Sequence, residues 1–160
     1  MSRKLVRHAA ADWFNAAQIP GLDHVYPGKP KEILWAKYSS GTNLCQAWLF
    51  LGPRREQRIA YGGDESGEKE INSLAHLIVT FRSSNPDWLE AQDDMDDVTE
   101  SLVEQLRAGG RKLGRPDVVL SAGEFEAGIE QQDEEPVAVN GGLMQAVCVI
   151  VFEITEIINS

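Results

Sequence analysis

The sequence predicts a single α/β (α+β) domain over residues 1–160, in which a mixed, mostly antiparallel β-sheet is flanked by an N-terminal helix and a long acidic amphipathic helix. Apolar residues recur at helical intervals in residues 3–17 and 86–108. The segments between and after them are rich in β-branched and aromatic residues, which is typical of strands. A chain of 160 residues can bury one substantial core without disulfides, so one domain is expected.

The first helix is predicted by apolar residues such as Val6, Ala10 and Trp13, which share one side of a helix. The stretch "IPG", ending at Gly21, interrupts this pattern and ends the helix. The stretch "HVYPGKP" that follows is rich in proline and glycine, so a turn-rich connection is expected there.

A block of strands follows, in which apolar residues alternate with polar ones or form short continuous runs. The pair Gly52 and Pro53 separates two of these strands. The glycine-containing acidic stretch "GGDESGEKE", residues 62–70, predicts an exposed loop before the last strand of the block. The predicted strands cover residues 33–38, 43–52, 54–62 and 73–83.

The second helix is predicted over residues 86–108 with a defined start and end. Asn85 can accept hydrogen bonds from free amides at the N-terminus, Pro86 suits the first helical position, and Asp87 interacts favourably with the helix dipole. The glycines at 109–110 end the helix.

The C-terminal part of the chain predicts two strands joined by a long loop. "PDVVLSAG" is a short strand, and the acidic residues 124–142 predict an exposed connection. "LMQAVCVIVFEITEII" is the longest strand signal in the chain. Since residues 146–152 are apolar at every position, this strand is expected to be central and covered on both faces.

The charge balance restricts the possible partners. With 15 Lys and Arg against 25 Asp and Glu, the net charge is -10, which opposes general binding to nucleic-acid backbones. No run of about 18 apolar residues occurs, so no membrane partner is expected. Cys45 and Cys148 lie in apolar, strand-like stretches, where a reduced and buried thiol is expected.

The stretch "DDMDD", residues 93–97, belongs to a longer acidic side of the second helix. At about 100° per residue, one side carries the apolar residues and must face the core. These residues are Trp88, Ala91, Met95, Val98, Leu102 and Leu106. The opposite side, which we call the acidic face, carries Glu90, Asp93, Asp97, Glu100 and Glu104.

A metal site is not expected at these carboxylates. Asp93, Asp94 and Asp97 match the DDxxD pattern by which terpenoid-type synthases hold magnesium. Such a site requires the carboxylates to converge in a closed cavity, but Asp93 and Asp97 point away from the core. The three histidines have no ligand spacing to one another. Ser66 and Lys69 match the nucleophile pattern S-x-x-K, but the companion motifs are missing, so the match carries almost no information. We therefore expect no catalytic residue, no cofactor and no metal.

The acidic face is most simply a solvated helix surface. However, Asp93 and Asp97 repel each other at i,i+4, as do Glu100 and Glu104. A basic surface of a neighbouring subunit would relieve this repulsion, and a need to repel an anion would explain it. A candidate basic interface, alternatively explained as compensation of the helix dipole, consists of Arg107, Arg111, Lys112 and Arg115. Arg3, Lys4 and Arg7 stand at the unfavourable end of the first helix, which also suggests a partner.

A resemblance to a known family rests on the order of the elements, on the acidic helix "DWLEAQDDMDDVTESLVEQLRAG" and on the ending "AGE…GI…DEEPV" to "FEITE". The chain resembles the tail terminator proteins of long-tailed, lambda-like bacteriophages, which are also described as minor tail or tail completion proteins. The resemblance covers most of the chain. It implies a sheet flanked by helices and assembly as a six-membered ring.

The resemblance also implies a function and partners. Such a ring caps the head-proximal end of the tail tube in the virion, stops tube growth and offers the surface for head-tail joining. The implied partners are other copies of the chain, the major tail tube protein and the head-tail connector, with DNA only as passing cargo. Loops 62–70 and 124–142 would be contact elements, and no enzymatic activity is implied. The alternatives are another neck protein or a cellular binding module.

Overall fold

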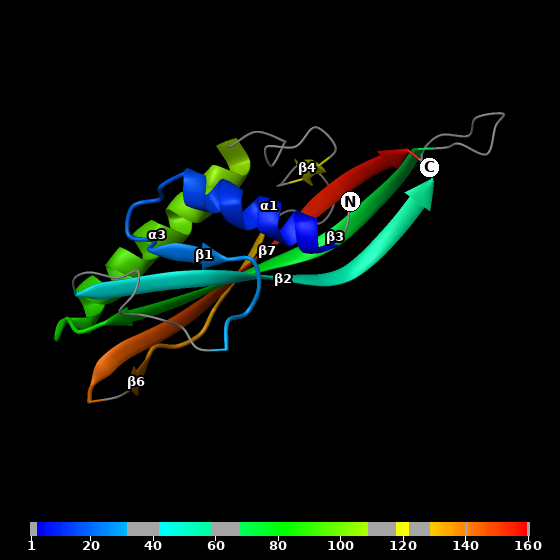
Figure 1. Cartoon of the computed structure of the whole chain (residues 1–160). Helices are drawn as coiled ribbons and strands as arrows, with labels where there is room; N and C mark the ends of the chain where they lie inside the picture. Colours follow the sequence, from blue (N-terminus) through cyan, green and yellow to red (C-terminus); the bar gives the residue numbers. More distant parts are fainter. Residues whose placement is uncertain are drawn as a thin grey trace.

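The computed structural model describes residues 3–31, 42–58, 68–108, 118–121, 129–139 and 141–159. Its described part is a mixed seven-stranded sheet with two helices on one face, which confirms the predicted fold class (Figure 1). The helices are α1 (Arg3–Ala16) and α3 (Trp88–Ala108). The strands are β1 (His24–Tyr26), β2 (Asn43–Arg58), β3 (Glu68–Ser83), β4 (Val118–Ser121), β5 (Glu130–Asp133), β6 (Val137–Val139) and β7 (Leu143–Asn159).

The sheet runs in the order β1-β2-β3-β7-β4, and β5 and β6 also pair with β7. All pairs among the described strands are antiparallel except β1 with β2. Helix α1 lies over β1 and β2, whereas α3 lies over β3 and β7. One apolar core therefore fills the space between the two helices and this face of the sheet.

Helix α1 confirms the prediction for the N-terminal segment and buries Val6, Ala10 and Phe14. The connection after it contains a short strand, β1, that the turn-rich sequence did not predict. The Asn15 side chain fixes this strand, because it donates to the Val25 carbonyl and accepts from the Val25 amide, each at 2.9 Å. A three-residue strand is too short to show an alternating pattern.

Strand β2 corrects the prediction of two separate strands at residues 43–52 and 54–62. It continues through Gly52 and Pro53 to Arg58, with a register shift in its pairing to β3 between Leu51 and Arg54. A bulge tolerates a proline, because the residue there need not donate to the ladder. Residues 59–62 and the predicted strand 33–38 lie outside the described residues.

Strand β3 is longer than predicted and pairs with β7 along its whole length, from Glu68 opposite Asn159 to Ser83 opposite Met144. The last three residues of the predicted loop 62–70 are therefore strand, since their backbone completes the ladder. Residues 62–67 of that loop lie outside the described residues.

The predicted loop 124–142 is corrected in the same way, because it contains β5 and β6, which both pair with β7. All four residues of β5, "EQQD", are exposed. A polar edge strand is held by backbone hydrogen bonds rather than by an apolar face, so no apolar alternation marks it. Residues 124–128 and 140 lie outside the described residues.

Strand β7 is central, as predicted, with β3 on one side and β4, β5 and β6 on the other. The sequence also predicted that both faces of this strand are covered, and this prediction is wrong. Cys148, Ile150 and Phe152 are buried beneath the helices, whereas Val149 and Val151 on the other face are only half-buried. Antiparallel sheets commonly have one face packed on the core and one partly open to solvent, and this sheet follows that rule.

Helix α3 begins two residues later than predicted, at Trp88. The N-cap is Asp87, not Asn85, because Asp87 Oδ1 accepts from the amides of Leu89 at 3.1 Å and Glu90 at 3.3 Å. Asn85 Oδ1 instead accepts from the Asp87 amide at 2.9 Å, and Pro86 precedes the helix. The helix ends at Ala108 as predicted, and residues 109–110 lie outside the described residues.

Candidate functional site: the acidic face of α3

The orientation of α3 agrees with its predicted periodicity. The apolar residues that were predicted to face the core are buried, except Trp88, which packs against the core and is half-buried. The buried residues are Ala91, Met95, Val98, Leu102 and Leu106. Their burial fixes the rotation of the helix about its axis, and therefore also fixes where the carboxylates point.

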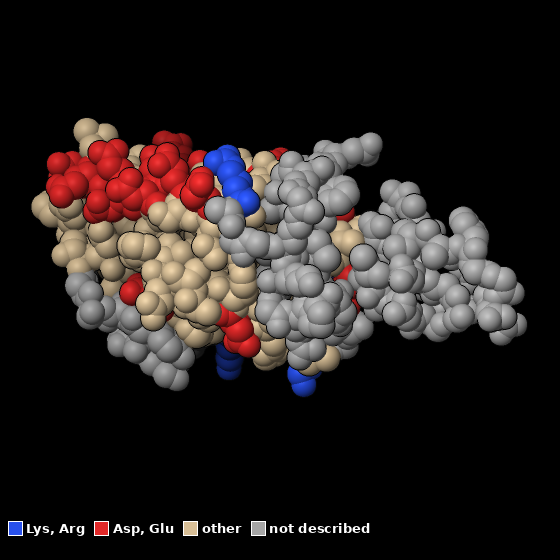
Figure 2. Space-filling model, turned by 90° about the horizontal axis from the view of Figure 1, so that it is seen from above, with Lys and Arg blue, Asp and Glu red and all other residues tan. Residues whose placement is uncertain are grey.

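The acidic face lies on the solvent side of α3. Glu90, Asp93, Asp97, Glu100 and Glu104 are all exposed, and Figure 2 shows the acidic atoms as a nearly continuous band along one edge of the molecule. The helix contains no lysine, and Arg107 in its last turn is its only arginine. The carboxylates at i,i+4 therefore repel one another without interleaved cations, which raises the electrostatic potential energy of this surface.

Asp94 does not belong to the acidic face. It is half-buried, and its Oδ2 accepts a hydrogen bond of 2.8 Å from Asn43 Nδ2 at the start of β2. The Ser83 hydroxyl donates to Asn43 Oδ1 at 2.6 Å, so this amide ties the first half of α3 to the ends of two strands. Asp93 and Asp97 are exposed, as predicted, whereas Asp94 is tied to Asn43, so the three aspartates of the DDxxD match do not converge on one point.

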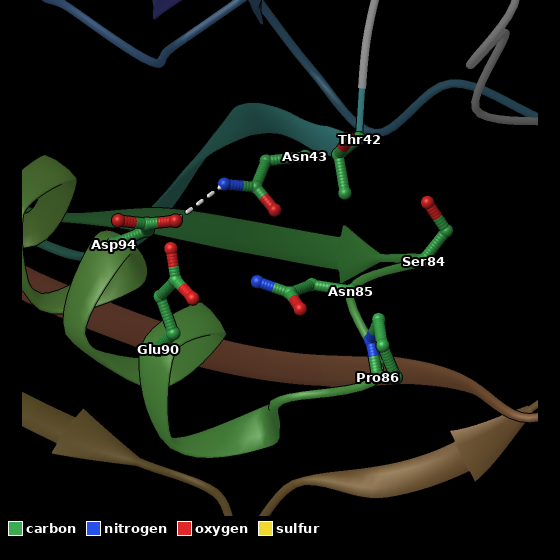
Figure 3. Close-up of a pocket in the computed structure, with 7 residues that line it drawn as sticks. All are labelled: Thr42, Asn43, Ser84, Asn85, Pro86, Glu90 and Asp94. Carbon is green, nitrogen blue, oxygen red and sulfur yellow. Dashed lines mark hydrogen bonds between the residues drawn. The ribbon is translucent and has the colours of Figure 1, made fainter.

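A polar hollow of about 470 Å³ lies beside this link (Figure 3). Glu90 and Asp94 are the carboxylates among its lining residues, and the Asn85 side chain points into the same space. The other lining residues are Thr42, Asn43, Ser84 and Pro86. No group of three or more His, Cys, Asp or Glu side chains with a metal-binding arrangement occurs within the described ranges. This arrangement can form hydrogen bonds with a polar partner.

The predicted basic interface is only partly within the described residues. Arg107 is exposed, and its Nη1 lies 3.6 Å from Glu104 Oε2 at i,i+3. Such an exposed pair contributes little to stability because water screens it. Arg111, Lys112 and Arg115 lie outside the described residues, so their predicted contact stays a prediction.

A second charged surface, which we call the cationic groove, was not predicted as a site. It is a hollow of about 250 Å³ between the start of α1, residues 28–29 and residues 49–51 of β2. Arg3 Nη2 donates to the carbonyls of Leu51 and Gly52 at 2.7 and 2.8 Å, and Arg7 Nη1 donates to the Pro27 carbonyl at 3.1 Å. The groove is lined by Arg3, Arg7, Gly28, Lys29, Leu49, Phe50 and Leu51.

The sequence contained one signal of this groove, namely the cations at the unfavourable end of the first helix. Arg3 and Arg7 are held there by carbonyls of other segments, which their guanidinium groups reach across the groove. Nothing in the spacing of the sequence indicates that residues near positions 5, 28 and 50 meet. The bulge in β2 supplies the two carbonyls that accept from Arg3.

The two cysteines are free and buried, as predicted. Burial raises the pKa of the Cys45 thiol, and the nearby Asp23 carboxylate raises it further. Burial also raises the pKa of the Cys148 thiol, with a further contribution from its hydrogen bond to Asp133. Because the thiolate is the reactive form, these raised pKa values disfavour nucleophilic reaction of both side chains near neutral pH.

Replacing Asp93 and Asp97 together with asparagine should leave α3 folded and stabilise the protein by about 0.3 kcal/mol, because one repulsive i,i+4 pair is removed. The measurement is thermal unfolding with and without magnesium. The matched control replaces Glu134 and Glu135, two exposed carboxylates outside the helix, with glutamine. A magnesium-dependent rise in the melting temperature that the asparagine variant loses would contradict this interpretation and indicate a bound ion.

Comparison with known protein families and with curated proteins found no match to this chain. Neither described helix combines the length and the apolar character that crossing a membrane requires.

Proposed function

We propose that this protein is a structural virion component that forms a ring at the head-proximal end of a phage tail tube. In this role it ends tube growth and provides the surface to which the filled head joins. Its partners are further copies of itself, the major tail tube protein and the head-tail connector, and DNA passes as cargo. The protein has no turnover chemistry and is assembled in the host cytoplasm.

The observation that carries the proposal is the exposed acidic face of α3. Its five carboxylates are exposed along one side of α3, and Glu90 among them also lines the polar hollow beside Asp94. An uninterrupted anionic surface of this kind repels the DNA backbone, which lets DNA slide past without binding. It also suits a contact with a basic surface on another subunit. Both uses require assembly, and neither requires catalysis.

The test is the mass of the protein under native conditions, alone and after mixing with purified tail tubes. We expect a ring, or a subunit that assembles when tubes are present, and electron microscopy should show it at one end of each tube. A protein that stays monomeric and does not bind the tubes would contradict the proposal and favour a cellular binding module. A ring that binds the head connector but not the tube would identify another neck protein.

A further inference from the structure

The cationic groove carries a concentration of positive charge. Arg3, Arg7 and Lys29 line it, and within the described residues no carboxylate lies within ion-pair distance of these three side chains. Phe50 also borders the groove, but its ring contacts His76 on the face of the sheet opposite α1. The cations of the groove fit an acidic partner.

The N-terminal half of α3 has the complementary composition. Leu89 in its first turn is 76% exposed, the highest value among the large apolar side chains of the described residues. Asp93 and Glu100 lie about 40° and about 20° from Leu89 around the helix axis, so the leucine stands on the acidic face. A groove lined by cations is complementary in charge to this row of carboxylates, and an exposed leucine among them is a feature that a protein contact would cover.

The two surfaces lie at opposite edges of the subunit. The groove is at the β1-β2 edge of the sheet, whereas α3 lies over β3 and β7 with Glu100 and Glu104 beside Gln131 of β5. In Figure 2 the acidic band follows one edge, and Lys and Arg atoms are visible both at one end of this band and at the opposite edge. The two surfaces therefore cannot meet within one subunit, but they can meet between two copies in a head-to-tail contact, which closes a ring if the rotation allows it.

We propose that the cationic groove of one copy binds the acidic face of α3 in the next copy. A second copy is the favoured occupant because each copy carries both complementary surfaces, one with cations and one with exposed carboxylates. Subunits with a net charge of -10 repel one another, so a stable contact must place the cations of one copy against the carboxylates of the next. This inference rests on the proposed ring and assigns its subunit interface.

The test uses two charge-reversed subunits. One carries Asp93→Lys and Glu100→Lys in the acidic face, and the other carries Arg7→Glu and Lys29→Glu in the groove. Each alone should associate at least about tenfold more weakly than the wild type. A mixture of the two should assemble again, because each reversed surface meets a reversed partner and each unchanged surface meets an unchanged one. Native mass measurement and light scattering at several salt concentrations report the assembly.

Two controls separate the contact from folding and from net charge. Glu134→Lys with Glu135→Lys changes the net charge by the same amount as the helix variant, at exposed carboxylates outside α3, and should assemble normally. Because Arg7 also donates to the Pro27 carbonyl, Lys29→Glu alone provides a milder groove variant. Circular dichroism establishes that each variant is folded.

Restored assembly in the mixture, but in neither single variant, supports the inference. Normal assembly of both single variants overturns the inference but does not contradict the proposed ring. The acidic face could then line the channel through which DNA passes. Loss of assembly without recovery in the mixture also overturns it, since the two surfaces would then not pair with each other. A wild type that forms no ring even with tail tubes defeats the proposed function instead.

Discussion

Replacing Phe152 with alanine is expected to destabilise the protein by about 3–5 kcal/mol, the range for truncating a fully buried phenylalanine. Phe152 is 0% exposed on the helix side of β7, and its ring centroid lies 6.0 Å from that of Phe14 in α1. The substitution removes the contact between the central strand and the first helix and leaves a cavity that the sheet cannot close. Denaturant unfolding followed by circular dichroism measures the loss.

The matched control is Phe50→Ala, the same truncation at a side chain that is 58% exposed. It should cost far less, because most of its surface already contacts water. A further variant that lacks both Phe14 and Phe152 measures their coupling, which we expect to be about 0.5–1.5 kcal/mol for this edge-to-face pair. Equal losses for Phe152→Ala and Phe50→Ala would show that the core is not where we describe it.

Replacing Gly21 with alanine is expected to be nearly as damaging, at about 2–5 kcal/mol. Gly21 has φ +83°, a conformation that costs other residues about 1–2 kcal/mol. An added Cβ would also lie 2.7 Å from Val98 Cγ2 on the inner side of α3, and such overpacking costs about 1–3 kcal/mol. The tight turn after α1 is thus packed directly against α3.

Gly141 separates these two contributions, because it also has φ +83° but an added Cβ there meets nothing within 4 Å. Gly141→Ala should therefore lose only the conformational part. The steric part of Gly21→Ala should decrease in a Val98→Ala background, which removes the methyl group in question. Equal destabilisation by the two glycine substitutions, measured by denaturant unfolding, would refute the contact between Gly21 and Val98.

The elements that the sequence predicted well are those whose apolar pattern extends over several turns or many alternations. Helix α3 is the clearest case, because its buried residues repeat over about four turns and Ala108 is followed by glycine. The elements it missed have no such pattern. Strand β5 is polar at every position, and β1 is only three residues long. Both are held by backbone pairing, which any side chain permits.

The sequence also predicted a break where the chain continues. A glycine followed by a proline usually ends a strand. Here the pairing of β2 with β3 shifts its register at Gly52 and Pro53, and β2 continues to Arg58. Similarly, Asn85 and Asp87 are both suitable N-caps, and only the hydrogen bonds to the amides of Leu89 and Glu90 identify Asp87. The local sequence does not distinguish a strand that ends at Gly52 from one that continues, or one N-cap from the other. Strand pairing decides the first case and the hydrogen bonds of the cap decide the second.

For the candidate site, the sequence by itself determined that five carboxylates of one helix face outward, because an apolar side of fixed period must be buried and the rest follows from helix geometry. Only the tertiary structure decided that Arg3, Arg7 and Lys29 form one groove, and that this groove lies at the opposite edge from the acidic face. These cations come from separate segments that the sheet brings together. Their proximity depends on long-range pairing, which no local period encodes.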